Sequence, residues 1–189
     1  MVCKIRCVLL ALLVGGVLTC PVFAASTFPD VDENAEYTEA VEYLFKVGIM
    51  EGDENGYFNP SKTVTRAEMA TIVCRMLRET ENLSTSSAFS DVSTDHWANK
   101  YIGKAAELGI VDGYGDGKFG PSDYVTYEQA VTMIIRAVGG EDEAQDEGGY
   151  PNGYLTVANN NNLLDGVDLS IGEFMPRSDI AIVIYNCIG

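Results

Sequence analysis

VGIMEGDENGYFNPSKTVTRAEMA occupies residues 47–70, and LGIVDGYGDGKFGPSDYVTYEQA occupies residues 108–130. The two stretches belong to a longer match, because an offset of 61 residues aligns 28–77 with 89–138 without a gap. Self-similarity at a fixed period indicates a supersecondary unit that is used more than once. The chain is therefore predicted to consist of copies of one such unit.

Each copy is predicted to fold as a helix, a turn-rich loop and a second helix. Apolar residues recur at helical spacing in the first helix, and Asn34 and Asp95 are its N-cap candidates. Gly48 and Gly109 are each followed by isoleucine, which is typical of a Schellman ending with a left-handed glycine. These residues predict where the first helix of each copy ends.

The second helix of each copy opens on a predicted capping box. Thr65 and Glu68 in the first copy, and Thr126 and Gln129 in the second, have the spacing Thr-x-x-Glu/Gln. An apolar stripe follows each box and predicts a core that the copies share. The loops before the boxes carry two phenylalanines that are predicted to point inward, Phe58 and Phe119.

A third, more divergent copy is predicted over 150–189. Asn162 takes the position of the helix-ending glycine, and asparagine is the second-best residue for a left-handed conformation. Pro176 and Arg177 open the second helix, and Asp179 stands where the first copy has a glutamate. The copy therefore keeps the plan of the unit with a different cap.

These signals divide the chain into repeats at 27–80, 88–139 and 150–189. Residues 140–149 are acidic and glycine-flanked without apolar periodicity, and they predict a solvated linker with neither structure nor ligand. One helix pair buries too little apolar surface to be stable alone. The three repeats are therefore expected to pack together and to leave grooves between neighbours.

Residues 1–24 differ in kind from the repeats. Basic residues precede an apolar run at 8–18 that is too short to span a bilayer, and small residues favour cleavage after Ala24. This pattern predicts a secretory signal peptide and no membrane span after its removal. The alternative is a lipoprotein signal with Cys20 as the lipid-bearing residue, although Thr19 stands where a glycine, alanine or serine is expected.

The charge of the mature chain limits the classes of partner that it is expected to bind. The formal net charge of −16 becomes −18 when Lys4 and Arg6 leave with the signal. Such a field repels nucleic acid and anionic membrane surfaces, so neither is expected as a partner. Cys74 and Cys187 remain in apolar helical runs, which predicts buried free thiols and neither a disulfide framework nor a cysteine metal site.

The FPDV and FSDV openings, HWA before a helix, and the spacing of G-I-x-x-G, G-x-F-x-P and T-R-A-E resemble the S-layer homology family. The resemblance covers nearly all of the mature chain. It implies an all-α fold in which three helix-loop-helix repeats form a pseudo-threefold spindle. It also implies a secreted module at the cell wall or S-layer surface of a bacterium. Such a module binds secondary cell-wall polysaccharide on peptidoglycan non-covalently, commonly through pyruvate ketals.

The resemblance assigns sugar binding to the arginine of T-R-A-E, which is Arg66 here. An arginine at the first helical position faces the positive end of the helix dipole, which is disfavoured by roughly 0.3–1 kcal/mol. A ketal carboxylate would offset this through a charge-assisted contact of about 1.5–3 kcal/mol. Arg177 is the equivalent in the third copy, whereas Tyr127 replaces the arginine in the second.

The other glycan-binding candidates also have structural explanations. Capping alone accounts for Thr65 and Glu68. Trp97 either stacks on a sugar face or fills the core. Gly52 and Gly113 either allow close approach of a ligand or satisfy the geometry of a turn.

Rival functions find less support in the sequence. His96 is the only histidine, and neither G-x-S-x-G nor H-E-x-x-H occurs, so we predict no catalytic site, no cofactor and no metal site. Residues 112–123 superficially resemble an EF-hand loop, but Tyr114 and Asp123 are poor residues for its third and twelfth positions. The remaining alternative is a surface protein–protein interaction or assembly module with degenerate glycan grooves, whose partners are other surface-layer proteins.

Overall fold

The computed structural model describes residues 26–81, 83 and 86–189, and this part of the chain contains seven α-helices and no β-strand. The helices are α1 Thr38–Lys46, α2 Arg66–Met76, α3 Asn99–Glu107, α4 Tyr127–Ala137, α5 Glu141–Asp146, α6 Asn152–Asn160 and α7 Arg177–Ile188. The predicted all-α class is confirmed for these residues. The predicted signal peptide, residues 1–24, lies outside them.

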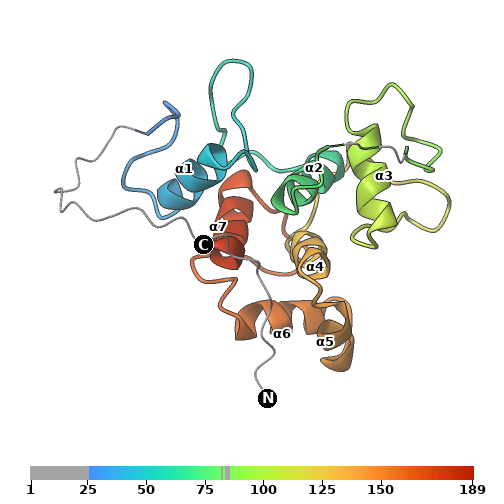
Figure 1. Ribbon diagram of the computed structural model, residues 1–189. Helices are drawn as coiled ribbons and strands as arrows, with labels where there is room; N and C mark the ends of the chain where they lie inside the picture. The colour runs from blue at the N-terminus through green and yellow to red at the C-terminus, as the bar shows by residue number, and fades with distance from the viewer. Residues whose placement is uncertain (1–25, 82, 84–85) are drawn as a thin grey trace.

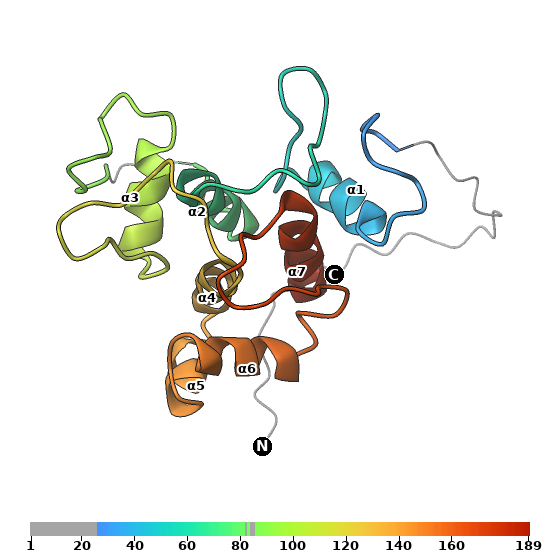
Figure 2. The same cartoon turned by 180° about the vertical axis from the view of Figure 1, so that it is seen from behind.

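The second helix of each repeat packs against the first helix of another repeat. Helix α2 contacts α3, α4 contacts α6, and α7 returns to α1. Figure 1 shows α2, α4 and α7 gathered at the centre with α1, α3 and α6 around them, and Figure 2 shows the same neighbours from behind. The last repeat therefore closes on the first.

A closed ring of backbone hydrogen bonds joins the segments that precede the three central helices. The Val125 N–H donates to the Val64 carbonyl at 2.9 Å, and the Met175 N–H donates to the Val125 carbonyl at 3.1 Å. The Val64 N–H donates to the Met175 carbonyl at 3.4 Å and completes the ring. Because each repeat supplies one residue, all three are needed to satisfy these backbone groups.

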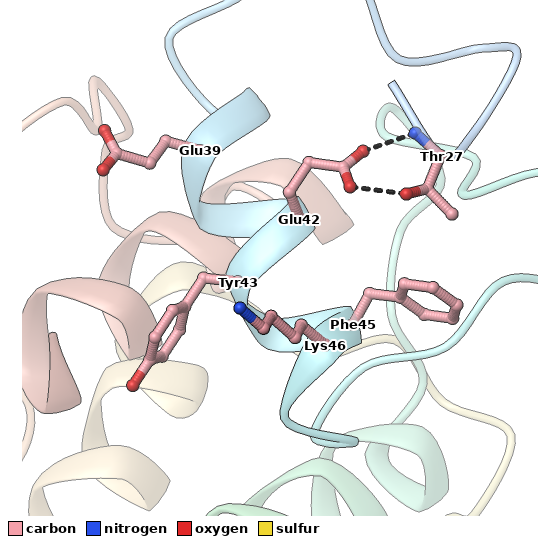
Figure 3. Close-up of a pocket in the computed structure, with 6 residues that line it drawn as sticks. All are labelled: Thr27, Glu39, Glu42, Tyr43, Phe45 and Lys46. Carbon is pink, nitrogen blue, oxygen red and sulfur yellow. Dashed lines mark hydrogen bonds between the residues drawn. The ribbon is translucent and has the colours of Figure 1, made fainter. Parts of the chain in front are cut away.

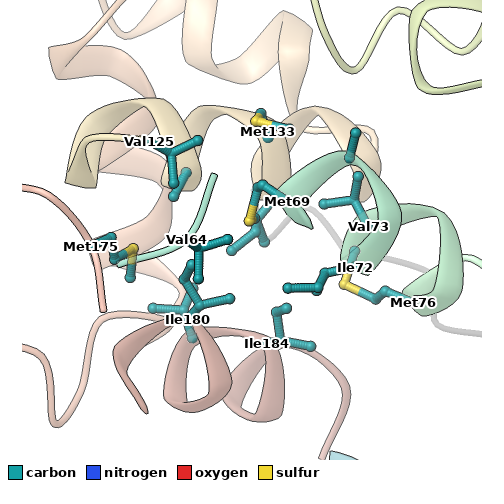
Figure 4. Close-up of a cluster of buried hydrophobic side chains, with 14 of the residues drawn as sticks. Val64, Met69, Ile72, Val73, Met76, Val125, Met133, Met175, Ile180 and Ile184 are labelled. Atoms are coloured by element: carbon teal, nitrogen blue, oxygen red, sulfur yellow. The ribbon is translucent and has the colours of Figure 1, made fainter. Parts of the chain in front are cut away.

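Buried apolar side chains from the three repeats form one core, as the sequence stripes predicted. Figure 4 shows the part that lies between the central helices. Its labelled members are Val64, Met69, Ile72, Val73, Met76, Val125, Met133, Met175, Ile180 and Ile184. Phe58 and Phe119 point inward as predicted, since they are 1% and 0% exposed. Burial of this surface is the main driving force for packing the repeats together.

The predicted ends of the first helices are confirmed. Gly48, Gly109 and Asn162 have φ angles of 74°, 70° and 58°. The Ile49 N–H donates to the Leu44 carbonyl at 2.9 Å, which is the long bond of a Schellman motif. Equivalent bonds follow the other two left-handed residues.

The predicted N-caps of the first helices are wrong. Helix α1 begins after Tyr37 and α3 begins after Ala98, and neither residue makes a side-chain cap. Asn34 instead lies in a turn before α1, where its N–H donates to the Asp32 carboxylate at 2.9 Å. Asp95 occupies the matching turn before α3. Local side-chain bonding in a turn competed with helix capping at these positions.

The capping boxes of the second helices differ between copies. In α2 the Glu68 N–H donates to Thr65 Oγ1 at 3.2 Å, and the Thr65 N–H donates to Glu68 Oε2 at 2.9 Å. In α4 the Thr126 N–H donates to Gln129 Oε1 at 3.2 Å. Thr126 Oγ1 is buried without a hydrogen-bond partner in the described part of the chain. Both predicted capping boxes are thus present, although the Thr126 hydroxyl in the second copy faces the Gln129 N–H without a well-formed hydrogen bond.

The segment 140–149 is not the unstructured linker that its composition predicted. It contains α5, whose Ala144 is fully buried. Tyr154 Oη donates to Glu141 Oε2 at 2.6 Å, and Arg136 Nε donates to the same oxygen at 2.9 Å. One buried alanine and two tertiary hydrogen bonds order a segment that has no periodic apolar signal of its own.

Cys74 is a buried free thiol, as predicted, whereas Cys187, which was also predicted to be buried, is only partly buried. Its Sγ donates to the Tyr101 carbonyl at 3.5 Å, and burial raises the pKa of the thiol to about 12. The thiol is therefore protonated and unreactive at neutral pH. Within the described residues, no helix combines the length and the apolar character that a membrane crossing requires.

Two grooves between the repeats

Arg66, at the start of α2, reaches into the loop of the second repeat. Its Nε donates to the Phe119 carbonyl at 2.7 Å, and its Nη2 donates to the Asp112 carbonyl at 2.8 Å. The guanidinium also lies 4.6 Å from the centre of the Phe119 ring, and the residue is 7% exposed. The side chain therefore fastens repeat one to repeat two.

Arg177, at the start of α7, repeats this arrangement in the loop of the first repeat. Its Nε donates to the Phe58 carbonyl at 2.8 Å, and its Nη2 donates to the Glu51 carbonyl at 2.7 Å. The guanidinium lies 4.7 Å from the centre of the Phe58 ring. The structure thus places the two predicted arginines in equivalent but separate grooves.

The two arginines have acidic neighbours but no carboxylate at ion-pair distance within the described residues. Neither Arg66 nor Arg177 forms a salt bridge there, and both bind neutral carbonyl groups instead. Burial lowers the pKa of both side chains, while Asp112 near Arg66 and Glu68 near Arg177 act in the opposite direction, and an arginine stays charged at neutral pH. A largely desolvated guanidinium without a carboxylate in contact can bind an anion that reaches it.

We name the Arg66 groove groove A. Its pocket has a volume of about 390 Å³. It is lined by Arg66, Ile110, Val111, Asp112, Gly113, Tyr114, Gln129, Thr132, Met133, Arg136 and Tyr150. Tyr150 is 56% exposed, and the buried Thr132 hydroxyl has no hydrogen-bond partner in the described residues. Groove A therefore offers two cations, an open aromatic ring and an unused hydroxyl.

We name the Arg177 groove groove B. It comprises two adjoining pockets of about 140 and 240 Å³. Their lining is Ile49, Met50, Glu51, Gly52, Asp53, Phe58, Asn59, Lys62, Glu68, Thr71, Ile72, Arg75, Trp97 and Arg177. Trp97 is 61% exposed, so it does not fill the core. Its indole stacks on the His96 ring, with the ring centres 5.7 Å apart, and lies at the rim of the groove.

Each groove takes functional groups from all three repeats. Groove A combines Arg66 of the first, Arg136 of the second and Tyr150 of the third. Groove B combines Arg75 of the first, Trp97 of the second and Arg177 of the third. Neither groove can form within one repeat.

The equivalent positions of a third groove carry no cation. Tyr127 stands at the position of Arg177, Asn186 at the position of Arg75, and Glu36 at the position of Trp97, each in another copy of the repeat. Tyr127 is 8% exposed and its N–H donates to the Glu173 carbonyl at 2.8 Å. This position thus keeps the backbone contact between repeats and lacks the charge.

Residues 27–70 and 88–131 match the S-layer homology domain. The match covers the first two repeats through the start of their second helices. Helices α6 and α7 of the predicted third repeat lie outside this match and pack against helices of the first two repeats.

Relatives of the chain carry names of surface proteins. It is 37% identical over 172 residues to "Cell surface protein" of Thermoanaerobacter kivui, covering 88% of this chain and 22% of that one. It is 36% identical over 168 residues to "Middle cell wall protein" of Brevibacillus brevis, covering 87% and 16%. It is 31% identical over 184 residues to "Surface-layer 125 kDa protein" of Lysinibacillus sphaericus, covering 89% and 15%. The chain therefore spans less than a quarter of the length of these relatives.

The T-R-A-E stretch of the first repeat contributes residues to both grooves. Arg66 lies in groove A, whereas Glu68 lies in groove B beside Arg177. Glu68 Oε1 accepts from Lys62 Nζ at 2.9 Å while its other oxygen caps α2. Thr65 caps the same helix and lines neither groove. Adjacent residues of one motif therefore face different sites.

Gly52 and Gly113 line the grooves, and close packing explains why both are glycines. A Cβ atom on Gly52 would lie 2.6 Å from a ring carbon of Phe28. A Cβ atom on Gly113 would lie 2.6 Å from a ring carbon of Phe89 and from the Lys118 carbonyl. Neither glycine has a positive φ, so turn geometry does not require a glycine at these positions. The close packing of the phenylalanine that opens each repeat requires one.

The aspartates of FPDV and FSDV hold the groove-forming loops. The Asp91 carboxylate accepts from the N–H groups of Phe119 and Gly120, each at 2.8 Å. Asp30 accepts from Phe58 and Asn59 in the same way, at 2.8 and 2.6 Å. These bonds fix the two carbonyl groups that receive the Nε atoms of Arg66 and Arg177.

A further pocket lies on the exposed side of α1 in the first repeat. Figure 3 shows Tyr43 and Phe45 pointing to different sides of this helix, with no convergence of polar groups. Glu42 is already bound by the Thr27 N–H and hydroxyl, at 2.7 and 2.6 Å. In the described residues no group of three or more metal-ligating side chains is placed to hold a metal ion. Grooves A and B are the better candidates.

The sequence argument missed Tyr150, Arg75 and Arg136 as groove residues. Tyr150 and Trp97 both stand two positions before the first residue of a helix, α6 and α3 respectively. Arg75 and Arg136 are matched in the 61-residue offset and lie nine positions after the first residue of α2 and α4. An alignment of the copies on the first residues of their helices would have identified all three as groove residues.

Proposed function

We propose that the protein anchors itself non-covalently to the bacterial cell wall by binding secondary cell-wall polysaccharide. The S-layer homology domains and the names of the relatives support a location at the cell wall and point to a structural surface protein rather than an enzyme. Acidic, pyruvate-bearing sugars in grooves A and B are the ligand. The carrying observation is a largely desolvated guanidinium in each groove that binds neutral carbonyl groups and forms no salt bridge within the described residues.

The chemistry of each groove suits an acidic sugar. The guanidinium charge binds a ketal carboxylate with a contact of about 1.5–3 kcal/mol. The exposed ring of Trp97 or Tyr150 covers an apolar sugar face at the rim. The overall charge of −16 does not prevent this, because salt screens it beyond about 8 Å while the arginines act at contact distance.

Two grooves on one molecule can hold one repetitive polymer. When the first groove is occupied, a second ketal on the same chain binds at a raised effective concentration. Weak individual contacts then add to firm retention. The cation-free third set of positions contributes to folding rather than to this binding.

Sedimentation with isolated cell walls tests the proposal. We expect wild-type protein to sediment with intact walls and to stay in solution after acid has stripped the secondary polymer. Trp97→Ala and Tyr150→Ala should each reduce sedimentation, and the double variant should reduce it much further. Tyr124→Ala is the matched control, because Tyr124 is 49% exposed and lines neither groove. Equal sedimentation with stripped walls contradicts polysaccharide binding.

One observation supports the alternative role in protein assembly. Tyr124 and Phe174 are both about half exposed, and their ring centres lie 5.7 Å apart beside the backbone ring. An exposed aromatic pair suits a protein contact. Under this alternative, Tyr124→Ala rather than the groove variants would abolish retention.

A further inference from the structure

A carboxylate on the rim of each groove is paired with a second arginine. Glu51 Oε2 lies 2.8 Å from Arg75 Nη1 in groove B, and Asp112 Oδ2 lies 2.8 Å from Arg136 Nη1 in groove A. The two pairs occupy matching positions in the 61-residue offset. The acid side chains are 59% and 75% exposed, whereas the arginine side chains are 25% and 20% exposed.

The residue that carries the rim carboxylate touches both cations of its groove. The Glu51 carbonyl accepts from Arg177 Nη2 at 2.7 Å while its carboxylate pairs with Arg75. The Asp112 carbonyl accepts from Arg66 Nη2 at 2.8 Å while its carboxylate pairs with Arg136. The rim carboxylate therefore stands between the two guanidinium groups that an incoming anion would approach.

We propose that Arg75 and Arg136 are second anion-binding residues, and that Glu51 and Asp112 occupy them until the carboxylate of an acidic glycan takes their place. This inference rests on the proposed function and deepens it. An exposed ion pair is weak, so its acid turns into water at little cost. A neutral sugar gains nothing from the exchange, and the rim carboxylate therefore selects for charged glycans.

The two grooves are unequally prepared for this exchange. Arg136 is also held by Glu141 Oε2 of α5, 2.9 Å from its Nε, and its guanidinium lies 5.6 Å from the Tyr154 ring centre. Arg136 therefore keeps its position when the Asp112 carboxylate turns away into water. For Arg75, Glu51 is its one salt-bridge partner in the described part of the chain. Groove A is therefore the more preorganised of the two.

The third set of positions provides an internal comparison. Asn186 stands where the other repeats have Arg75 and Arg136, and its Nδ2 donates to the Leu163 and Asp165 carbonyls at 3.2 and 2.9 Å. Asp165 aligns with Glu51 and Asp112, but within the described residues it forms no salt bridge with an arginine. Within the described residues, the rim carboxylate thus forms an ion pair only in the two grooves that contain Arg66 or Arg177.

Groove B contains its own optical probe, because Trp97 is the only tryptophan in the chain. Its fluorescence is followed while the purified protein is titrated with a methyl glycoside that bears a pyruvate ketal. The methyl ester of the same ketal serves as the uncharged ligand. We expect Glu51→Gln to bind the acid about threefold to fivefold more tightly than wild type, the range set by an exposed ion pair. Its affinity for the ester should not change.

Two further variants separate exchange from a general charge effect. Glu54→Gln removes an exposed acid from the same loop and should change the affinity by less than about twofold. Arg75→Gln should weaken binding of the acid about tenfold. Combining Glu51→Gln with Arg75→Gln should give no tightening over Arg75→Gln alone, because the exchanged partner is gone.

The outcomes separate this inference from the proposed function. Unchanged or weaker binding of the acid by Glu51→Gln overturns the exchange, since Glu51 would then hold a sugar hydroxyl or only its loop. Absence of any response to the ketal also overturns it. Sedimentation with intact walls, run on the same protein, then decides whether anchoring survives without acidic sugars.

Discussion

At the scale of single residues, Arg66 and Arg177 have two roles in one side chain. Each ties its own repeat to another through two backbone carbonyl groups and, within the described residues, forms no salt bridge. Replacement by alanine would remove the tie along with the charge and leave buried carbonyl groups unsatisfied. Loss of wall binding in such a variant would therefore not separate folding from recognition, which is why the aromatic rim residues are the cleaner test.

The protonation state of Asp91 affects the stability of the loop that receives Arg66 in groove A. Burial acts to raise the pKa of its carboxyl group, but hydrogen bonds from two backbone N–H groups outweigh burial and lower it. A carboxylate with a depressed pKa stabilises the fold above its unfolded-state pKa, and this stabilisation is lost as the pH falls through the folded-state pKa.

We therefore expect Asp91→Asn to be less stable than wild type at neutral pH, with a difference that shrinks as the pH falls below about 3.9. Urea unfolding of both proteins at a series of pH values measures this difference. Asp95→Asn, which removes a nearby exposed carboxylate, should show little effect at any pH. A difference for Asp91→Asn that does not vary with pH would contradict the assignment.

At the scale of elements, α5 shows how an acidic stretch becomes part of a site. Its Glu141 accepts hydrogen bonds from Arg136 and Tyr154, and its Ala144 packs against α6. The close approach depends on Gly153, because a Cβ atom there would overlap the Ala144 carbonyl oxygen. The position of α5 in turn fixes the second arginine of groove A.

Gly153→Ala is accordingly expected to lower the free energy of unfolding by about 1–3 kcal/mol or more, the cost of overpacking a close contact. It should also weaken binding in groove A, because Arg136 loses its support from α5. Chemical denaturation measures the first effect. Asn152→Ala changes the exposed neighbour on α6 and should stay within about 0.5 kcal/mol of wild type. Equal stability of the two variants would show that α5 does not pack as described.

At the scale of the whole molecule, the repeats are not independent domains. Helix α1 packs on α7, and the backbone ring needs one residue from each repeat. Removing the third repeat would expose the buried face of α1 and leave the Val64 N–H without its carbonyl partner. Removing the third repeat would therefore destabilise the two remaining repeats as well.

A chain that ends at Gly139 is thus expected to lose cooperative unfolding, although it keeps both segments that match the S-layer homology domain. Calorimetry of this fragment should show no sharp transition, and it should bind a dye that detects exposed apolar surface. The full chain should unfold in one transition. A sharp transition in the fragment would mean that the first two repeats carry a core of their own.

The sequence by itself determined the repeat, the all-α class, the inward phenylalanines and the ends of the first helices. These features depend on residues close together in the chain, such as Gly48 followed by Ile49 or Thr65 followed by Glu68. Local patterns misplaced the N-caps of α1 and α3 and missed α5, where turn bonding and tertiary contacts outweighed propensity.

Only the tertiary structure decided which residues share a groove. Arg66 and Glu68 are two positions apart and face different sites, whereas Arg66, Arg136 and Tyr150 come from three repeats and face the same one. Closure of the third repeat onto the first sets these neighbours. That closure is made by contacts between residues far apart in the chain, and a periodic pattern along the sequence carries no information about them.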